Sequence, residues 1–203
     1  MIRMLDHVVL VARDLDAAVA DHRRRGFTVT PGGKHADGLT HNALVPFADG
    51  SYLEIVAFPD LDRAVSHRWW KIAAEGGGFA DFALLSDDLG ADTLALKEIV
   101  TRSSATGGRT RPDGIRLEWR TAILSAPLPF LIQDLTSREL RVPQGAAAQH
   151  ANGAGGIAKV ILGAKELADA EWRYARLRER GAPEIELRAD ERDAVLDVRF
   201  KGD

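Results

Sequence analysis

The stretch MLDHVVLV, residues 4–11, decides how the rest of the chain is interpreted. Its β-branched and large apolar residues predict a strand. Apolar side chains fall on both of its faces, with Leu5, Val9 and Val11 beside His7 and with Val8, Leu10 and Ala12 opposite. A strand that is apolar on both faces lies between two layers of structure. Asp14 then predicts the cap of a helix that ends at Gly26.

The composition is that of an ordinary globular protein, with 45% apolar and 28% charged residues in a chain of 203. The net charge of -3, with acids and bases interspersed, gives no case for nucleic acid or an anionic membrane as partner. The absence of cysteine excludes disulfides, thiolate metal sites and a cysteine nucleophile. No apolar run approaches the roughly 20 residues of a membrane span and no signal peptide is visible, so we expect a cytoplasmic protein.

The first 58 residues read as a β-α-β-β-β unit. After the helix comes a short strand at 27–30, ended by Pro31-Gly32-Gly33, and a loop at 34–40. Strands at 41–47 and 51–58 follow, joined by an Asp49-Gly50 turn. A helix at 60–74 and the linker glycines 76–78 complete a connecting segment, 59–78.

The opening pattern then returns. Residues 79–89, FADFALLSDDL, align with residues 5–15 when Asp88-Leu89 is placed on Asp14-Leu15. A second unit, 79–135, follows, with a helix to about Thr101, a loop at 102–113, strands at 114–124 and 130–135, and a weak or missing second strand. Residues 136–203 hold a polar loop, a strand at 157–162, a helix at 166–180 and strands at 184–188 and 194–200, interpreted as a hairpin. We expect a repeated unit of this size to bury its open face against its partner.

The repeated unit, opening on an apolar strand with a histidine, resembles the vicinal oxygen chelate (glyoxalase/bleomycin resistance/dioxygenase) superfamily. The run GGKHADGLTHNALVPFADGSYLEIVAF, residues 32–58, is similar to the glyoxalase-like domain family, in which a further partial unit follows the first two. The resemblance implies an α+β fold of repeated βαβββ units that form a cup-shaped mixed sheet with outer helices, plus a partial third βαββ unit.

In metal-binding members of the superfamily, the ligands come from the first and fourth strands of each unit. Carried over by position, these are His7, Glu54, Asp81 and Gln133, of which the last two depart from the usual residue types. The resemblance thus implies a divalent Zn, Fe, Mn, Mg or Ni ion. A carboxylate such as Glu54 needs a partner when buried, and the alternative is a His⁺–Glu⁻ pair that holds the sheet together. Asp81 could instead pair with an arginine, such as Arg109 or Arg120.

Further polar residues stand where a ligand could be oriented. These candidates for ligand binding are His35, His41, Asn42, Tyr52 and His150. Their alternative interpretation is as ordinary loop and strand residues that satisfy the local backbone.

The resemblance implies two functions. One is a metal-dependent lyase, isomerase or dioxygenase that acts on a carbonyl or vicinal-oxygen substrate, with Glu54 as the catalytic group. The other is a metal-free protein of the bleomycin-resistance type that binds or sequesters a small molecule. Because such folds often dimerise, a homodimer is a further possibility.

Overall fold

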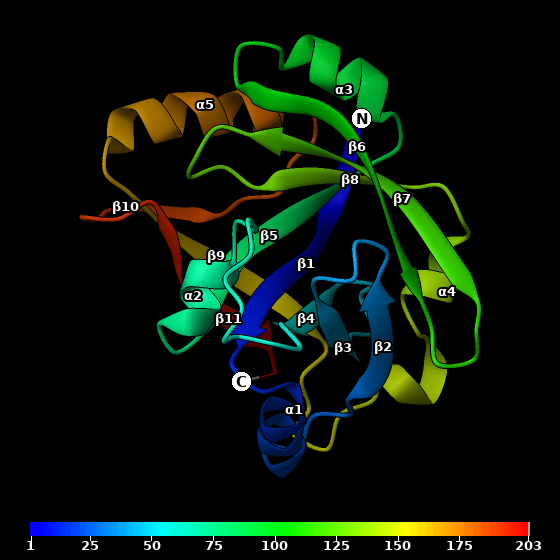
Figure 1. The fold of residues 1–203 in the computed structure, drawn as a ribbon. Coiled ribbons are helices and arrows are strands. Elements are labelled where there is room, and N and C mark those ends of the chain that lie inside the picture. Colours follow the sequence, from blue (N-terminus) through cyan, green and yellow to red (C-terminus); the bar gives the residue numbers. More distant parts are fainter. Residues whose placement is uncertain (203) are drawn as a thin grey trace.

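The computed structural model describes residues 1–202 and has two parts, a closed barrel and a smaller sheet (Figure 1). The barrel strands follow the order β1-β4-β3-β2-β6-β7-β8-β5, and the smaller sheet has the order β10-β9-β11. The first unit comprises β1 (Ile2–Ala12), α1 (Leu15–Arg24), β2 (Thr30–His35), β3 (His41–Pro46) and β4 (Tyr52–Ala57). After α2 (Trp70–Ala74), the second comprises β5 (Gly78–Ser86), α3 (Leu89–Ala95), β6 (Val100–Thr110), β7 (Arg116–Leu124) and β8 (Phe130–Asp134). The remainder is α4 (Arg138–Arg141), the 3₁₀ helix η1 (Gly145–Ala148), β9 (Gly156–Ala164), α5 (Leu167–Glu179), β10 (Glu186–Ala189) and β11 (Ala194–Lys201).

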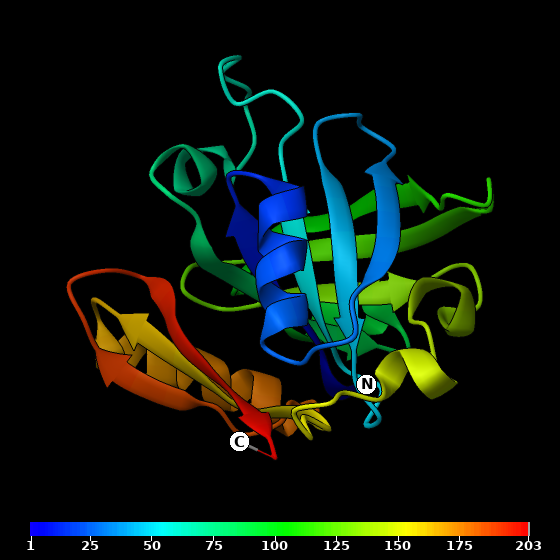
Figure 2. The same ribbon diagram turned by 90° about the horizontal axis from the view of Figure 1, so that it is seen from below.

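Two strand pairings join the units into the barrel. The first strands of the units, β1 and β5, run antiparallel to each other, and the second strands, β2 and β6, close the other side. Helix α1 lies across the outer face of β3 and β4 (Figure 2), and its first turn is capped by Asp14 Oδ1, which accepts a hydrogen bond from Ala17 N at 2.8 Å. The repeated α+β fold is therefore confirmed. No helix among residues 1–202 is long and apolar enough to cross a membrane.

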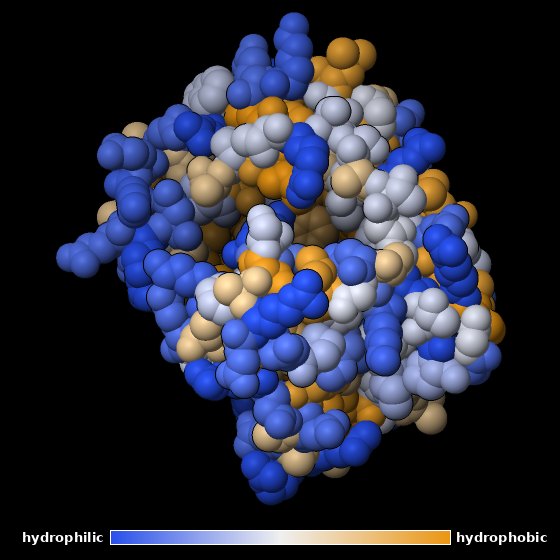
Figure 3. Space-filling view, viewed as in Figure 1, coloured by the Kyte–Doolittle hydropathy of each residue, from blue (hydrophilic) through white to orange (hydrophobic). Residues whose placement is uncertain are grey.

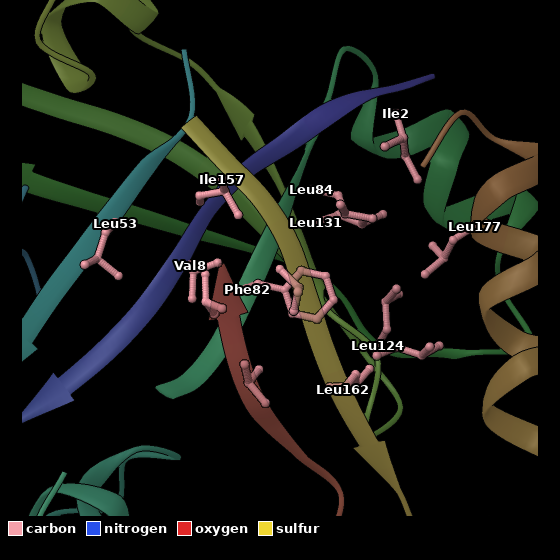
Figure 4. Close-up of a cluster of buried hydrophobic side chains, with 14 of the residues drawn as sticks. Ile2, Val8, Leu53, Phe82, Leu84, Leu124, Leu131, Ile157, Leu162 and Leu177 are labelled. Atoms are coloured by element: carbon pink, nitrogen blue, oxygen red, sulfur yellow. The ribbon is translucent and has the colours of Figure 1, made fainter. Parts of the chain in front are cut away.

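The two apolar faces of β1 pack in different environments. Val8 belongs to the outer cluster, which lies between the barrel and the layer formed by β9, β11 and α5 (Figure 4). Val9 and Val11 belong to a second cluster on the inner side of the barrel. Each face of β1 is thus buried by a different part of the chain, as expected for a strand between two layers.

An irregularity near the start of β1 changes which side chains share a face. The pairing of β1 with β5 shifts between Leu5 and His7, so that Asp6 lies at a bulge. Leu5, expected beside His7, packs with the outer cluster instead. Asp6 comes next to the His7 ring, with Oδ1 at 2.7 Å from Nδ1.

The second strand of the second unit, expected to be weak or missing, is the eleven-residue β6. Helix α3 ends at Ala95, and the expected loop at 102–113 is mostly strand. The run of Ser, Thr, Ala and Gly gave no apolar alternation, because one face of β6 meets solvent and the other borders a cavity. Similarly, only Trp70–Ala74 is helical in the expected helix at 60–74, since Asp60 Oδ1 accepts from the backbone N of Asp62 and Arg63 and forms a turn.

Pro31-Gly32-Gly33, expected to end a strand, instead lies inside β2, where the barrel closes. A Cβ on Gly33 would stand 2.0 Å from the carbonyl oxygen of Thr110. Glycine is therefore required for β2 to approach β6.

The expected hairpin between residues 184–188 and 194–200 was also wrong. Strands β10 and β11 do not pair with each other but flank β9 on its two sides, β10 parallel and β11 antiparallel. The reason is that α5 forms the crossover of a β-α-β connection, which places β10 beside β9.

Candidate functional site

The barrel encloses a cavity of about 520 Å³, a volume suited to a small molecule, and Figure 3 shows the hollow on this face. The first unit lines it mainly with polar side chains, and the second with arginine and threonine as well as aromatic and aliphatic side chains. The polar members from the first unit are His7, His35, Asp37, Thr40, Asn42, Tyr52 and Glu54, and the second unit contributes Arg102, Thr106, Arg109, Trp119, Thr121, Ile123, Phe130 and Ile132. The loop residues Ser66, His67, Arg68 and Trp69 lie at its edge.

His7 and Glu54, singled out from the sequence, meet in this cavity. They lie on the paired parallel strands β1 and β4, and His7 Nε2 is 3.4 Å from Glu54 Oε2. Both side chains are less than 10% exposed. Tyr52, two residues before Glu54, stacks on the His7 ring at 4.6 Å between centroids. Neighbouring strands thus fix both the ring and the carboxylate.

Two more side chains from the first unit converge on Glu54. Asn42 Nδ2 donates a 2.5 Å hydrogen bond to Oε1, and His35 Nε2 lies 3.4 Å from the same oxygen. The other ring nitrogen of His35 is 2.6 Å from the hydroxyl of Thr40. One carboxylate is therefore surrounded by two imidazoles and one amide at the wall of the cavity.

This arrangement sets the protonation of the pair. Burial by itself would raise the pKa of Glu54, but the hydrogen bonds from His35 and His7 hold it well below its usual value. Burial would lower the pKa of His7, but its contacts with Asp6 and Glu54 raise it. At neutral pH Glu54 is consequently ionised, and the contacts of His7 stabilise its protonated form relative to a free imidazole.

Beneath His7 lies a buried network that was not foreseen from the sequence. Arg141 of α4 donates to both oxygens of Asp6, at 2.9 and 2.8 Å, and to the Tyr52 hydroxyl at 2.7 Å. It also pairs with Asp134 at the end of β8. These contacts lower the pKa of Asp6 well below its usual range, despite the opposing effect of burial. The network fixes the acceptor that orients His7.

The sequence carried a signal for only part of this network. Asp6 is a carboxylate within an apolar strand, which is the same signal that singled out Glu54. Arg141 lies in a polar stretch and has no pattern that marks it. Arg109 also lies in a stretch without periodicity, and from the sequence we considered it only as a possible partner of Asp81.

The second-unit positions carried over from the family lie away from Glu54. Asp81 pairs with Arg68 and accepts from Trp69 Nε1 at 3.4 Å, and it borders a separate, smaller pocket. Gln133 bonds to Leu89 N and to the carbonyl oxygen of Asp87 at the start of α3. In β8 it is Phe130 and Ile132 that face the cavity, so that Gln133 has the opposite phase.

His41 and His150 do not line the cavity either. Because side chains alternate along β3, Asn42 faces inward and His41 faces the other way. His150 accepts from Thr28 N at 2.9 Å and lies 2.9 Å from the Pro46 carbonyl oxygen. It therefore fastens the segment after β8 to the first unit.

The divalent ion implied by resemblance would be held by residues from both units. Asp81 and Gln133 are engaged elsewhere, and no three His, Cys, Asp or Glu side chains within residues 1–202 are arranged to hold a metal ion. The nitrogens of His7 and His35 that face the site are directed at the carboxylate of Glu54. The four-residue metal centre therefore does not fit this arrangement of side chains.

Comparison with known proteins gives a family and a fold. A family model described as "Glyoxalase-like domain" matches residues 5–178, and no curated protein matches significantly. A hypothetical protein from Staphylococcus aureus has a similar structure, with a TM-score of 0.72 and 14% identity over 96% of this chain and 89% of that chain. A methylmalonyl-CoA epimerase variant from Streptomyces coelicolor is 23% identical over 67% of this chain and 100% of its own, with a TM-score of 0.47.

Proposed function

Because the chain belongs to the glyoxalase-like domain family of the vicinal oxygen chelate superfamily, we propose that it is an enzyme that binds a small molecule in the barrel cavity and transfers a proton on it. The reaction class is isomerisation or elimination next to a carbonyl group. Such reactions need a base at the carbon that loses the proton.

The convergence of three side chains on one carboxylate is the observation that carries this proposal. Glu54 lies in the cavity wall with His7 and His35 each at 3.4 Å. Glu54 accepts the proton from the substrate carbon. Asn42 and the two imidazoles hold the carboxylate in place, and an imidazole can pass the proton onward. Asp6, held by Arg141, keeps the His7 ring in position.

A binding protein is the second candidate, and one observation favours it. The hydrogen bonds that hold the pKa of Glu54 well below its usual value make this carboxylate a weak base. A pair of this kind can serve to stabilise the cavity wall while aromatic side chains hold the ligand, as in the metal-free alternative implied by resemblance.

Proton exchange with solvent distinguishes these functions without knowledge of the natural substrate. Small keto acids and acyl compounds with acidic C–H bonds are incubated with the protein in D₂O, and deuterium incorporation is followed by NMR. We expect exchange above the uncatalysed rate, lost at least 100-fold in Glu54→Gln. Asp81→Asn makes the same chemical change in the second unit and should leave exchange intact. Ligand binding without exchange would instead establish the binding protein.

A divalent ion on His7 and Glu54 stays a prediction that direct measurement tests. Metal content is determined for protein purified without chelator and for His7→Ala and Glu54→Ala. A near-stoichiometric ion in the wild type, lost in both variants, would support a metal centre at the first unit. Deuterium exchange by metal-free protein would show that proton transfer does not require the ion.

A further inference from the structure

We infer that the ligand of this cavity carries a carboxylate or another oxyanion bound by Arg109, with a flat apolar body against the aromatic wall of the second unit. The inference shares with the proposed function only the location of the ligand. It concerns what binds, and it holds whether or not Glu54 transfers a proton.

Arg109 is a buried cation, and not all of its N–H donors have a hydrogen-bond partner in the described part of the protein. It lies on β6, lines the cavity, and is 3% exposed. Its Nη1 donates to Asn42 Oδ1 at 3.3 Å and its Nη2 to the Arg141 carbonyl oxygen at 3.1 Å. Its Nε is buried and has no hydrogen-bond partner among residues 1–202. Because a guanidinium carries five N–H donors, this side chain can still bind a ligand.

The charge of Arg109 has no direct ion-pair partner in the described part of the chain, although the nearby Glu54 partly balances it through space. Both of its acceptors are neutral, and within residues 1–202 no carboxylate oxygen lies within the 4.0 Å of an ion pair. Arg141 differs, since Asp6 and Asp134 both pair with it. Burial lowers the pKa of Arg109, as expected for a cation without a direct counter-ion. Leaving a buried charge unpaired costs several kcal/mol, which a bound anion would offset.

Arg102 extends the positive charge toward the edge of the cavity, whereas the charge of the neighbouring Arg68 is paired with Asp81. Arg68 and Arg102 both border it, from the loop after β4 and from β6. Burial, together with the nearby Arg102, lowers the pKa of Arg68 to about 10. The positive charge of Arg102 at the entrance attracts an anion from solution.

The wall beside Arg109 suits the apolar part of such a ligand. Trp119 and Phe130 line the cavity, and Gly107 lies next to Trp119. A Cβ at Gly107 would stand 2.4 Å from Trp119 Nε1, so glycine allows the indole to lie close against β6. Aromatic faces of this kind bind flat apolar groups.

Matched charged and neutral probes test this inference. Binding of phenylacetate, phenylacetamide and phenyl phosphate is measured by calorimetry on the full chain. We expect the better of the two anions to bind at least tenfold more tightly than the amide, and this preference to weaken as salt is added. The stronger anion tells whether the site is built for a carboxylate or for a phosphate.

Variants then assign the effect to one side chain. Arg109→Gln should lose at least tenfold in affinity for the anion and little for the amide. Arg120→Gln, the same change at an exposed residue of β7 outside the cavity, should bind as the wild type does. Equal affinity for acid and amide in the wild type, or no binding of either anion, would overturn the inference even if Arg109→Gln fails to fold. Because calorimetry on the wild type measures anion binding and D₂O incubation measures proton exchange, a failure of this inference is distinguished from a failure of proton transfer.

Discussion

The two units share one strand-and-helix pattern but contribute different sets of side chains to the cavity. The first supplies His7, His35, Asn42 and Glu54, all within one hydrogen-bonded group. The second supplies an aromatic and aliphatic wall with Arg109 beside it. Duplication of a unit therefore conserves the path of the chain, while each copy is free to take a separate role. In the function we propose, the first unit supplies the proton-transfer groups and the second helps to hold the ligand.

The support beneath the two halves differs as well. Asp6 lies next to His7 and pairs with Arg141, whereas the aligned position next to Asp81 is Ala80. Asp81 depends instead on Arg68, which lies in the loop at the cavity edge. The first unit is therefore supported by a buried ion-pair network and the second by a pair that involves a loop residue. We expect substitutions in the buried network to reduce stability more.

The largest effect on stability is expected from disrupting the buried network around Arg141. Arg141→Met removes the arginine that binds both oxygens of Asp6 and also pairs with Asp134, leaving Arg138 as their remaining arginine partner, and should lower the free energy of unfolding by about 3–5 kcal/mol. Urea denaturation measures it. Arg176→Met, at an exposed pair with Glu179, is the control and should cost no more than about 1 kcal/mol. Equal losses in both variants would mean that the buried network does not support the first unit.

A smaller loss is expected where the two units join. Gly33→Ala forces a Cβ against the Thr110 carbonyl oxygen at the β2–β6 closure and should cost about 3 kcal/mol. Gly78→Ala is the matched control, since Gly78 has nearly the same φ, +140° against +138° at Gly33, but a Cβ at this position would meet no atom within 4 Å. Its cost should be about 1–2 kcal/mol. Thermal unfolding of both variants isolates the contribution of barrel closure.

The smallest effect is a dependence of stability on pH that the first unit imposes. The pKa of His7 is raised above 6.5, so its contribution is complete below pH 6.5 and is lost as the pH rises through the folded value. The pKa values of Asp6 and Glu54 are lowered, so their contributions are present above 3.8 and 4.5 and are lost at more acidic pH.

Stability should therefore be greatest between these limits, with an alkaline slope of at most about 1.4 kcal/mol per pH unit from His7. Urea denaturation from pH 5.5 upward measures this slope. His7→Gln should remove it, and an unchanged slope in that variant would show that another group is responsible.

Much of the first unit followed from local sequence, and the failures have specific causes. The pairing of His7 with Glu54 was predicted because a carboxylate in an apolar strand needs a partner. Asp6 was missed because a bulge changed the alternation of β1. Gln133 was assigned to the fourth-strand position, yet Ile132 is the residue of β8 that faces inward there. An alignment error of one residue places a side chain on the opposite face of a strand. Aligning the second unit with the first did not determine the position in β8 to within one residue.

Local sequence was enough to predict the repeated units, the strand with two apolar faces and the need for a partner at Glu54. It was enough because alternation, caps and turn residues act over a few neighbouring positions. The folded arrangement of the strands was needed to show that His35, Asn42 and Arg109 meet around one cavity. It was also needed to show that Arg141 reaches Asp6 across 135 positions of the chain. Those contacts depend on strand order, on the closure between β2 and β6 and on the bulge in β1, none of which is encoded by local periodicity.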